Sequence, residues 1–599
     1  MGNVSIPALI KEAIFLNDTL SDPEIRLSEG KDKERAVFHV KAFLEKASPY
    51  MSSNELRPSL DKLREICSLM KLGESDVKIQ MFVNPILKLP DEMLSTVVGF
   101  LNPKEFHKVA VTSNPSRPSL SKISDTEKLI MISSGARVRD LGLTEKSLLE
   151  LIRRNEGIKI QCLNLDGVII TEIHVLLDLC PEVHRLSAVN SGFNSNLASQ
   201  ITSYENIREL NLGFDQIGDE GVEHISKMRG LTSLSLGHSG LGDISVNHIS
   251  KMHGLKSLTL KYNPTIGDLG AELISKMPGL TSLNLSFNQI GPEGAQHISK
   301  MVGLKNLSLW SNMLGSLGAE HISNMHGLTT LSFKGDGIGD MGAEHISKMD
   351  GLNSLDLSFD EISDVGAEQI SKMGGLTSLN LSKNHIGPQG AEHISKMSGL
   401  RSLDLRENHI GDVGAQHVSK MSGLTKLDLT DNQIGSEGAE DISKMHGLRS
   451  LDLAENHIGD VGAQYVSKMS GLTNLDLTGN QIGPAGAEHI SKMNELRSLD
   501  LSKNQISDVG AQHISKMRRL TSLNLSKNQI GNVGAEHIST MHTLARLNLS
   551  RNPIGHTGAQ HISKMRELTK LTLLDSYIGA SFREKIRQKF EARGVEVFL

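Results

Sequence analysis

The sequence predicts an α/β solenoid, in which a curved parallel sheet lines the inside of a horseshoe and helices cover its outside, preceded by a small all-α region. Three observations lead to this prediction. A unit of 24 residues recurs fifteen times from Ile207 to residue 567, with one extra residue between Asn263 and Ile266. Each unit opens with alternating leucines, as in a short strand, and continues with apolar residues at helical spacing. Strands stack ~4.8 Å apart whereas packed helices need ~8–10 Å, so the stack must curve with its helices outward.

The unit from 280 to 303, LTSLNLSFNQIGPEGAQHISKMVG, shows how each element is expected to arise. Leu280, Leu283 and Leu285 alternate as in a strand, and the run from 290 to 301 has helical spacing. Counting Leu280 as the first position, the ninth is usually asparagine. We expect its amide to bond the backbone of adjacent turns and to form a ladder along the stack. The apolar face of the predicted helix consists of Ala295, Ile298 and Met301.

This spacing resembles the leucine-rich repeat family, in the strand-plus-helix class of ribonuclease inhibitor. The resemblance implies a leucine-rich-repeat solenoid over residues 159–578, with degenerate first units around Leu163 and Leu186. A linker and N-terminal cap are expected over 121–158. A C-terminal cap is expected over 579–599, where the charged run from Phe582 to Gly594 is typical of a terminal helix.

Composition and charge argue against several classes of partner. Lys and Arg number 63 against 69 Asp and Glu, a net charge of −6, so no basic excess is present to bind nucleic acid or an anionic membrane. Three cysteines, none in a Cys-x-x-Cys pair, favour a reducing compartment. Lys11, Glu12 and Asp18 stand where a secretory signal needs an apolar run, and no apolar stretch is long enough to span a bilayer. We therefore expect a cytoplasmic or nuclear protein without a nucleic-acid or membrane partner.

Repetition argues against catalysis, because nearly every His, Asp and Ser recurs at a fixed position of the unit. The histidine at the eighteenth position is the strongest metal candidate. However, helices ~8–10 Å apart place neighbouring histidines badly for sharing a zinc ion, whose ligand nitrogens lie ~2.0–2.1 Å away. We predict a non-enzymatic chain with no catalytic residue, metal or cofactor. This row comprises His224, His248, His297, His321, His345, His393, His417, His489, His513, His537 and His561.

Side chains at the third, fifth, seventh and eighth positions are expected to point into the horseshoe, where folding does not dictate their identity. Aromatic residues gather on the first half of this surface. Exposed rings are expected at a binding hot spot and are otherwise costly to solubility, so we predict that these rings bind a target protein. The alternative is that they lie against neighbouring side chains at the strand edge. The predicted target-binding rings are Phe214, Tyr262, Phe287 and Phe359 at the eighth position and Trp310, the single tryptophan, at the seventh.

The fifth position becomes acidic farther along, where Asp356 and Asn380 are followed by five successive aspartates. Carboxylates ~4.8 Å apart should raise one another's pKa, and a basic region of the target would relieve the repulsion. The alternative is that arginines of the same units, at 401, 406, 449 and 497, already compensate the charge. The predicted acidic contacts are Asp404, Asp428, Asp452, Asp476 and Asp500. Basic residues follow at Lys503, Lys527, Arg546, Arg551 and Lys570, and this zoning favours a protein or peptide ligand.

Residues 1–85 contain helical patterns of unknown role. Residues 89–113, LPDEMLSTVVGFLNPKEFHKVAVTS, resemble an F-box, with Leu-Pro followed by two short amphipathic helices and a break at Asn102-Pro103. Where that family usually has a tryptophan, this chain has Asn114-Pro115. The resemblance implies that an F-box-like segment over 86–120 docks the Skp-type adaptor of a cullin ubiquitin ligase; the alternative is an ordinary pair of capping helices. The implied adaptor contacts are Leu89, Pro90, Leu94, Val98, Leu101 and Phe106.

The leading hypothesis is therefore a non-catalytic substrate receptor of a Skp-cullin-F-box ubiquitin ligase, which captures a target protein on its concave face. A second hypothesis is a scaffold or inhibitor that binds a partner in the horseshoe without any ligase. A GTPase-activating protein on a leucine-rich horseshoe fits poorly, because no arginine stands out from its repeated copies. The 24-residue units also resemble F-box repeat effectors of plant-associated bacteria, and for such an effector the host cytosol is the expected location.

Overall fold

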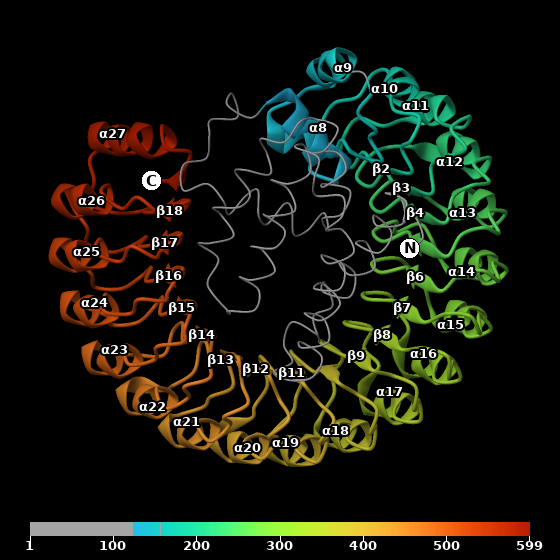
Figure 1. The fold of residues 1–599 in the computed structure, drawn as a ribbon. Coiled ribbons are helices and arrows are strands. Elements are labelled where there is room, and N and C mark those ends of the chain that lie inside the picture. The colour runs from blue at the N-terminus through green and yellow to red at the C-terminus, as the bar shows by residue number, and fades with distance from the viewer. Residues whose placement is uncertain (1–123, 156) are drawn as a thin grey trace, which may run out of the picture.

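The computed structural model describes residues 124–155 and 157–599, which form the curved solenoid of Figure 1. A parallel sheet of nineteen strands lines the inside, and each strand pairs with the next one along the chain. Successive strands keep one register, so that Leu379 lies opposite both Leu355 and Leu403. Helices cover the outside of the curve, which confirms the predicted solenoid.

Every strand is three residues long. The strands are β1 (Cys162–Asn164), β2 (Arg185–Ser187), β3 (Glu209–Asn211), β4 (Ser233–Ser235), β5 (Ser257–Thr259), β6 (Ser282–Asn284), β7 (Asn306–Ser308), β8 (Thr330–Ser332), β9 (Ser354–Asp356), β10 (Ser378–Asn380), β11 (Ser402–Asp404), β12 (Lys426–Asp428), β13 (Ser450–Asp452), β14 (Asn474–Asp476), β15 (Ser498–Asp500), β16 (Ser522–Asn524), β17 (Arg546–Asn548), β18 (Lys570–Thr572) and β19 (Glu596–Phe598).

The helices alternate with these strands after three initial elements. They are α8 (Asp125–Ser133), η3 (Val138–Leu141, a 3-10 turn), α9 (Glu145–Arg154), α10 (Ile173–Leu179), α11 (Ser195–Gln200), α12 (Gly218–Ser226), α13 (Asp243–Ile249), α14 (Asp268–Ser275), α15 (Pro292–Ile298), α16 (Gly315–Ile322), α17 (Gly339–Ile346), α18 (Asp364–Ile370), α19 (Pro388–Ile394), α20 (Gly411–Val418), α21 (Ser436–Ile442), α22 (Gly459–Val466), α23 (Pro484–Ile490), α24 (Asp508–Ile514), α25 (Asn532–Ile538), α26 (His556–Ile562) and α27 (Ala580–Glu591). None of these described helices is both long and apolar enough to cross a membrane.

The core repeats with the unit. In the unit from 376 to 399, Leu379 of β10 and Ile394 of α19 are both buried, as are their counterparts in the neighbouring units. One continuous cluster of buried residues therefore runs from Leu129 in α8 to Val595 beside β19. Because each unit buries its apolar faces against the next, the stack is stabilised by nearest neighbours.

The ninth-position asparagines form the predicted ladder. Asn384 Nδ2 donates to the carbonyl oxygens of Leu357 and Leu381, at 2.9 and 3.0 Å, and Asn384 Oδ1 accepts from Asp360 N and Ile362 N. Asn408, Asn456 and Asn504 donate to the equivalent pair of carbonyl oxygens, one in the preceding unit and one in their own. Each amide thus satisfies backbone groups of adjacent turns that are buried away from water.

A second link between units lies at the helix starts. Asp364 begins α18, and its Oδ1 accepts hydrogen bonds from Gly387 N at 2.7 Å and Gly390 N at 2.8 Å, at the start of α19. The same arrangement joins Asp412 to α21 and Asp460 to α23. A carboxylate placed at a helix N-terminus satisfies free N–H groups and favours the helix dipole.

The two ends of the stack differ from the repeating units. The elements α8, η3 and α9 precede β1, and buried side chains such as Leu129 and Leu148 join them to the core. At the other end α27 packs Ile586 and Phe590 against the last unit, and β19 then adds a further parallel strand beside β18. The expected terminal helix is present, and the strand after it was not predicted.

Candidate binding face

The inner face of the sheet carries the fifth-position side chains and, at the end of each strand, the eighth-position side chains. The seventh position was predicted to be open, but Ser286, Ser382 and Ser502 there are only 2%, 5% and 6% exposed. A small hydroxyl at this position packs under its neighbours; Ser286 Oγ, for example, lies 2.8 Å from Ser308 Oγ of the next unit. Long residues reach out instead, so Trp310 is half-buried and Arg406 is exposed.

Five rings from consecutive units form a continuous row, which we call the aromatic row. It runs from Phe214 through His238, Tyr262 and Phe287 to Trp310, with ring centroids 4.7, 5.9, 3.9 and 4.6 Å apart. Tyr262 and Phe287 stack at an interplanar angle of 11°. The rings thus lie against one another, which was the alternative considered above. Phe214 and Tyr262 nevertheless remain 51% and 39% exposed.

The eighth position has a left-handed backbone. Phe214, Tyr262, Phe287 and Phe359 have φ of 62°, 58°, 57° and 64°. A non-glycine residue in this conformation costs roughly 1–2 kcal/mol, and bulky side chains are rare there. The turn that follows each strand imposes this backbone geometry in every unit. The eighth-position side chains are therefore held at the end of the strand.

The predicted acidic contacts lie side by side across β11 to β15 and form what we call the acidic stripe. Asp404, Asp428, Asp452, Asp476 and Asp500 are direct partners in register. Burial, reinforced by Asp452 and Asp404, raises the pKa of Asp428 to about 6. Burial, reinforced by Asp452 and Asp500, raises the pKa of Asp476 to about 7. The predicted increase in pKa therefore occurs at these two residues, with burial as its largest cause.

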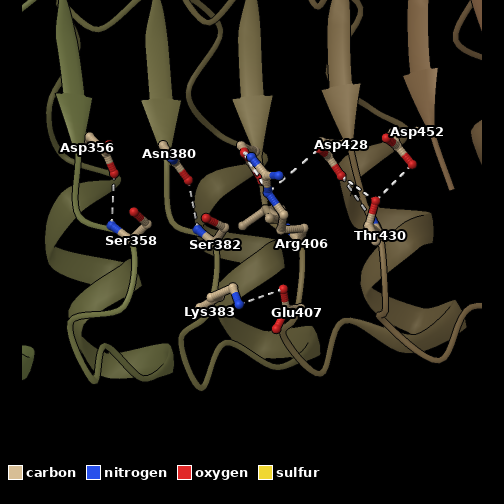
Figure 2. A network of polar contacts seen from close by, with 12 residues as sticks. Asp356, Ser358, Asn380, Ser382, Lys383, Arg406, Glu407, Asp428, Thr430 and Asp452 are labelled. Atoms are coloured by element: carbon tan, nitrogen blue, oxygen red, sulfur yellow. Dashed lines mark hydrogen bonds and ion pairs between the residues drawn. The ribbon is translucent and has the colours of Figure 1, made fainter. Parts of the chain in front are cut away.

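Figure 2 shows the polar contacts of Asp428 and Asp452 within the stripe. Thr430 Oγ1 lies 2.8 Å from Asp428 Oδ1 and 2.8 Å from Asp452 Oδ1. A hydroxyl has a single hydrogen to donate, so the two carboxyl groups share one donor. Because neighbouring carboxylates contribute to the raised pKa of Asp428 and of Asp476, a cation placed beside them would lower both pKa values.

The arginines compensate the stripe only in part. Arg406 Nε donates to Asp404 Oδ2 at 3.1 Å and lies 3.8 Å from Asp428 Oδ2. Arg401 and Arg449 instead donate to the backbone carbonyls of Gly423 and Gly471. The basic zone beyond is largely paired with acids: Lys503 with Glu455 at 2.6 Å, Arg551 with Asp575 at 2.9 Å and Lys570 with Glu596 at 3.4 Å. This zone therefore offers less unpaired positive charge than the sequence predicted.

Buried carboxyl groups at the ninth position, Asp215 among them, were missed by sequence analysis. Asp336 and Asp360 stand at the ninth position, where most units have asparagine, and are 6% and 0% exposed. Each lacks a hydrogen-bond partner at Oδ2 within the described residues. Burial raises the pKa of Asp336 to about 9 and that of Asp360 to about 7. The replacement of asparagine by aspartate at the ninth position of these units was the sequence signal that could have revealed them.

The remaining predicted sites divide between the described and the undescribed residues. Among residues 124–155 and 157–599, no group of three or more His, Cys, Asp or Glu side chains is arranged to hold a metal ion. Phe359 is 61% exposed and lies in the turn after β9, beyond the end of the aromatic row. The predicted adaptor contacts Leu89, Pro90, Leu94, Val98, Leu101 and Phe106 lie outside the described residues, as does the whole segment 1–120.

Comparisons with known proteins identify the repeats. A leucine-rich repeat family model matches residues 229–290, 398–458, 470–530 and 518–578, and a second leucine-rich repeat model matches 205–226 and 376–395. No curated protein matches the chain.

Solved structures with a similar fold include bacterial and plant proteins. An internalin of Listeria monocytogenes is 24% identical, covering 58% of this chain and 88% of its own, with a TM-score of 0.39. A leucine-rich repeat protein of Leptospira interrogans is 21% identical, covering 70% and 96%, with a TM-score of 0.40. The Arabidopsis receptor kinase HAESA, in complex with the peptide hormone IDA and the co-receptor SERK1, is 18% identical, covering 73% and 76%, with a TM-score of 0.35. The family matches and the parallel-sheet solenoid agree that this chain is built on leucine-rich repeats.

Proposed function

We propose that the inner face of the horseshoe binds a protein partner, with the aromatic row as its anchor and the acidic stripe guiding a basic region of the partner. The observation that carries this proposal is the continuous row of rings from Phe214 to Trp310, which stays partly exposed along the ends of β3 to β7. Exposed contiguous apolar surface is unfavourable in water, and aromatic residues dominate binding hot spots.

Site-specific photocrosslinking tests this proposal. A photoreactive amino acid is placed at position 287 in the aromatic row and, separately, at position 302. Val302 is 89% exposed in the turn after α15, so it serves as a matched exposed position away from the proposed face. A cell extract should give a discrete protein adduct at position 287 and not at 302. The same adducts at both positions would contradict binding at the inner face.

We further propose that this scaffold is the substrate receptor of a Skp-cullin-F-box ubiquitin ligase. Support comes from the sequence pattern of residues 86–120, in which Leu89-Pro90 precedes apolar residues at helical spacing, and from the long binding face that follows in the same chain. In this proposal Leu89, Pro90, Leu94, Val98, Leu101 and Phe106 contact the Skp-type adaptor, while the solenoid holds the target. The alternative is a scaffold or inhibitor that binds its partner without a ligase.

Co-purification of the full chain with a Skp-type adaptor separates these two proposals. The wild type should bind the adaptor, and the double variant Leu89→Ala with Pro90→Ala should not. The reconstituted complex should then transfer ubiquitin to the crosslinked target. A folded wild-type chain that fails to bind the adaptor would leave the scaffold or inhibitor as the function.

A further inference from the structure

The row of eighth-position side chains has a gap beside Trp310. All fifteen units from 207 to 567 have a positive φ at this position; thirteen of them carry a side chain there, and the other two have Gly335 and Gly479. A Cβ atom built on Gly335 would lie 3.7 Å from Phe359 Cδ1 and 3.9 Å from Trp310 Nε1. The gap is therefore bordered by the edge of the indole on one side and by the 61% exposed Phe359 ring on the other.

The border of this gap also offers hydrogen-bond donors. Within the described residues Trp310 is hydrogen-bonded through its backbone carbonyl, by Phe287 N and by Asn312 Nδ2, which leaves the indole N–H available. Lys334 Nζ lies 3.9 Å from the centroid of the Trp310 ring. The gap thus combines apolar walls with an N–H donor and an ammonium group.

Charge on this part of the face is one-sided. Among the third, fifth, seventh and eighth positions of the units from 231 to 351, Lys261 and Lys334 are the charged residues. Lys261 is exposed and Lys334 is half-buried, and neither pairs with a carboxylate in the part of the chain that the structure describes. From β4 onwards the first acid at these positions is Asp356, in β9, whereas Glu209 in β3 is paired with Arg185 at 2.6 Å. The formal charge at these positions from β4 to β8 is therefore positive, opposite in sign to that of the acidic stripe.

We propose that the gap at Gly335 receives an apolar side chain from an acidic, extended segment of the protein partner. This inference rests on the proposed function and names the chemistry of the partner at the aromatic row. Apolar groups of the anchor side chain would be buried between Trp310 and Phe359, a common setting for a hot spot. Carboxylates on the Phe214 side of the anchor would meet Lys334 and Lys261, and the carboxylates of Asp356 and the acidic stripe would repel them. The acidic segment therefore runs towards Phe214, and any basic region of the same partner lies over β11 to β15.

Substitution of the two glycines provides a matched pair of variants. Gly335→Phe fills the gap with a residue that Phe287 and Phe359 already accommodate at φ of 57° and 64°. Gly479→Phe makes the same change six units away, where the nearest obstacle is the flexible end of Glu455. Lys334→Glu reverses the charge beside Trp310. Because Trp310 is the single tryptophan of the chain, its fluorescence reports directly on the gap.

The probe is a phage-displayed library of short random peptides, selected on the full-length chain. Enriched peptides should be acidic with one large apolar residue, and titration of the synthetic peptides should change Trp310 emission. Gly335→Phe and Lys334→Glu should each weaken binding by about tenfold or more, the range expected for a hot spot, whereas Gly479→Phe should not.

Enriched peptides that are basic, or that bind the Gly335→Phe variant as well as the wild type, would overturn this inference and leave the proposed function standing. Failure to enrich any peptide, together with no adduct at position 287 in the crosslinking experiment, would overturn both. Circular-dichroism melting of each variant confirms that a loss of binding does not come from unfolding.

Discussion

Replacing Asp360 by asparagine should stabilise the solenoid, and more so at alkaline than at acidic pH. Asp360 Oδ2 is buried without a hydrogen-bond partner among the described residues, at the ninth position of its unit. At that position one unit later, Asn384 Nδ2 donates to two backbone carbonyls. An ionised carboxylate has no hydrogen to donate, so it can take the place of the amide only when it keeps its proton.

The size of the stabilisation expected from Asp360→Asn follows from the pKa of Asp360. Burial raises the pKa of Asp360 from 3.8 to about 7, so the folded state holds the proton more tightly than the unfolded chain does. The contribution of Asp360 to the free energy of unfolding is therefore fully present below about pH 4 and is lost as the pH rises through the pKa of the folded state. The difference of about 3 in pKa, at ~1.4 kcal/mol each, corresponds to a loss of roughly 4 kcal/mol by pH 7. Asparagine does not titrate and restores the donor, so Asp360→Asn should recover much of this free energy.

Urea unfolding at about pH 5 and about pH 8, followed by Trp310 fluorescence, measures the effect. Trp310 lies two units before the one that contains Asp360, so its fluorescence reports unfolding of this part of the stack even if the repeat array does not unfold in one step. Only about a third of the loss has developed at pH 5, and the gain from Asp360→Asn should be correspondingly smaller there.

The reverse change, Asn384→Asp, is the matched control. It should destabilise the chain increasingly as the pH rises, because it introduces the same buried carboxyl one unit later. Equal gains from Asp360→Asn at both pH values, or a destabilised variant at pH 8, would refute the reasoning.

Three other predictions concern helix capping and the binding face. Asp364→Ala removes two hydrogen bonds at the start of α19 and should lower the free energy of unfolding by about 1–2 kcal/mol in urea titrations; an unchanged value would mean that the link between α18 and α19 adds nothing. Trp310→Ala combined with Phe287→Ala should abolish partner capture while circular-dichroism melting stays nearly unchanged, whereas a large fall in melting temperature would identify these rings as core. Replacing Asp428, Asp452 and Asp476 together by asparagine should slow association with a basic partner most at low salt, as measured by stopped-flow, because salt screens exposed charges. Association of the wild type should also slow as the pH falls below about 7, because Asp476 and then Asp428 take up protons there. Association rate constants that change with neither salt nor pH would exclude electrostatic steering by the acidic stripe.

The fold could be predicted from the sequence because each unit contacts mainly its neighbours, so a local pattern contains the information for the whole stack. The contacts of the binding face depend on how neighbouring units are spaced and turned, which a repeat pattern does not specify. Tyr262 was expected to be either exposed or packed against a neighbour, and it is both. Lys503 reaches Glu455 two units away, a pairing that its own unit does not reveal. Ser382 was expected on the open face and is buried, because its side chain is too short to emerge.

The unit from 328 to 351 departs from its neighbours at several adjacent positions. Phe333 replaces the leucine at the sixth position, Gly335 leaves the eighth without a side chain, and Asp336 replaces asparagine at the ninth. The buried carboxyl of Asp336 lacks the amide donor, and Gly335, which suits the left-handed φ of 75° at this position, leaves the inner face without a side chain there. At the ninth position the preceding unit has Asn312, whereas the following unit also has a buried carboxyl, Asp360. Departures from a local rule without a structural gain are expected at functional sites. This unit lies between Trp310 and Phe359, so its cost in stability falls at the place where the partner's anchor is proposed to bind.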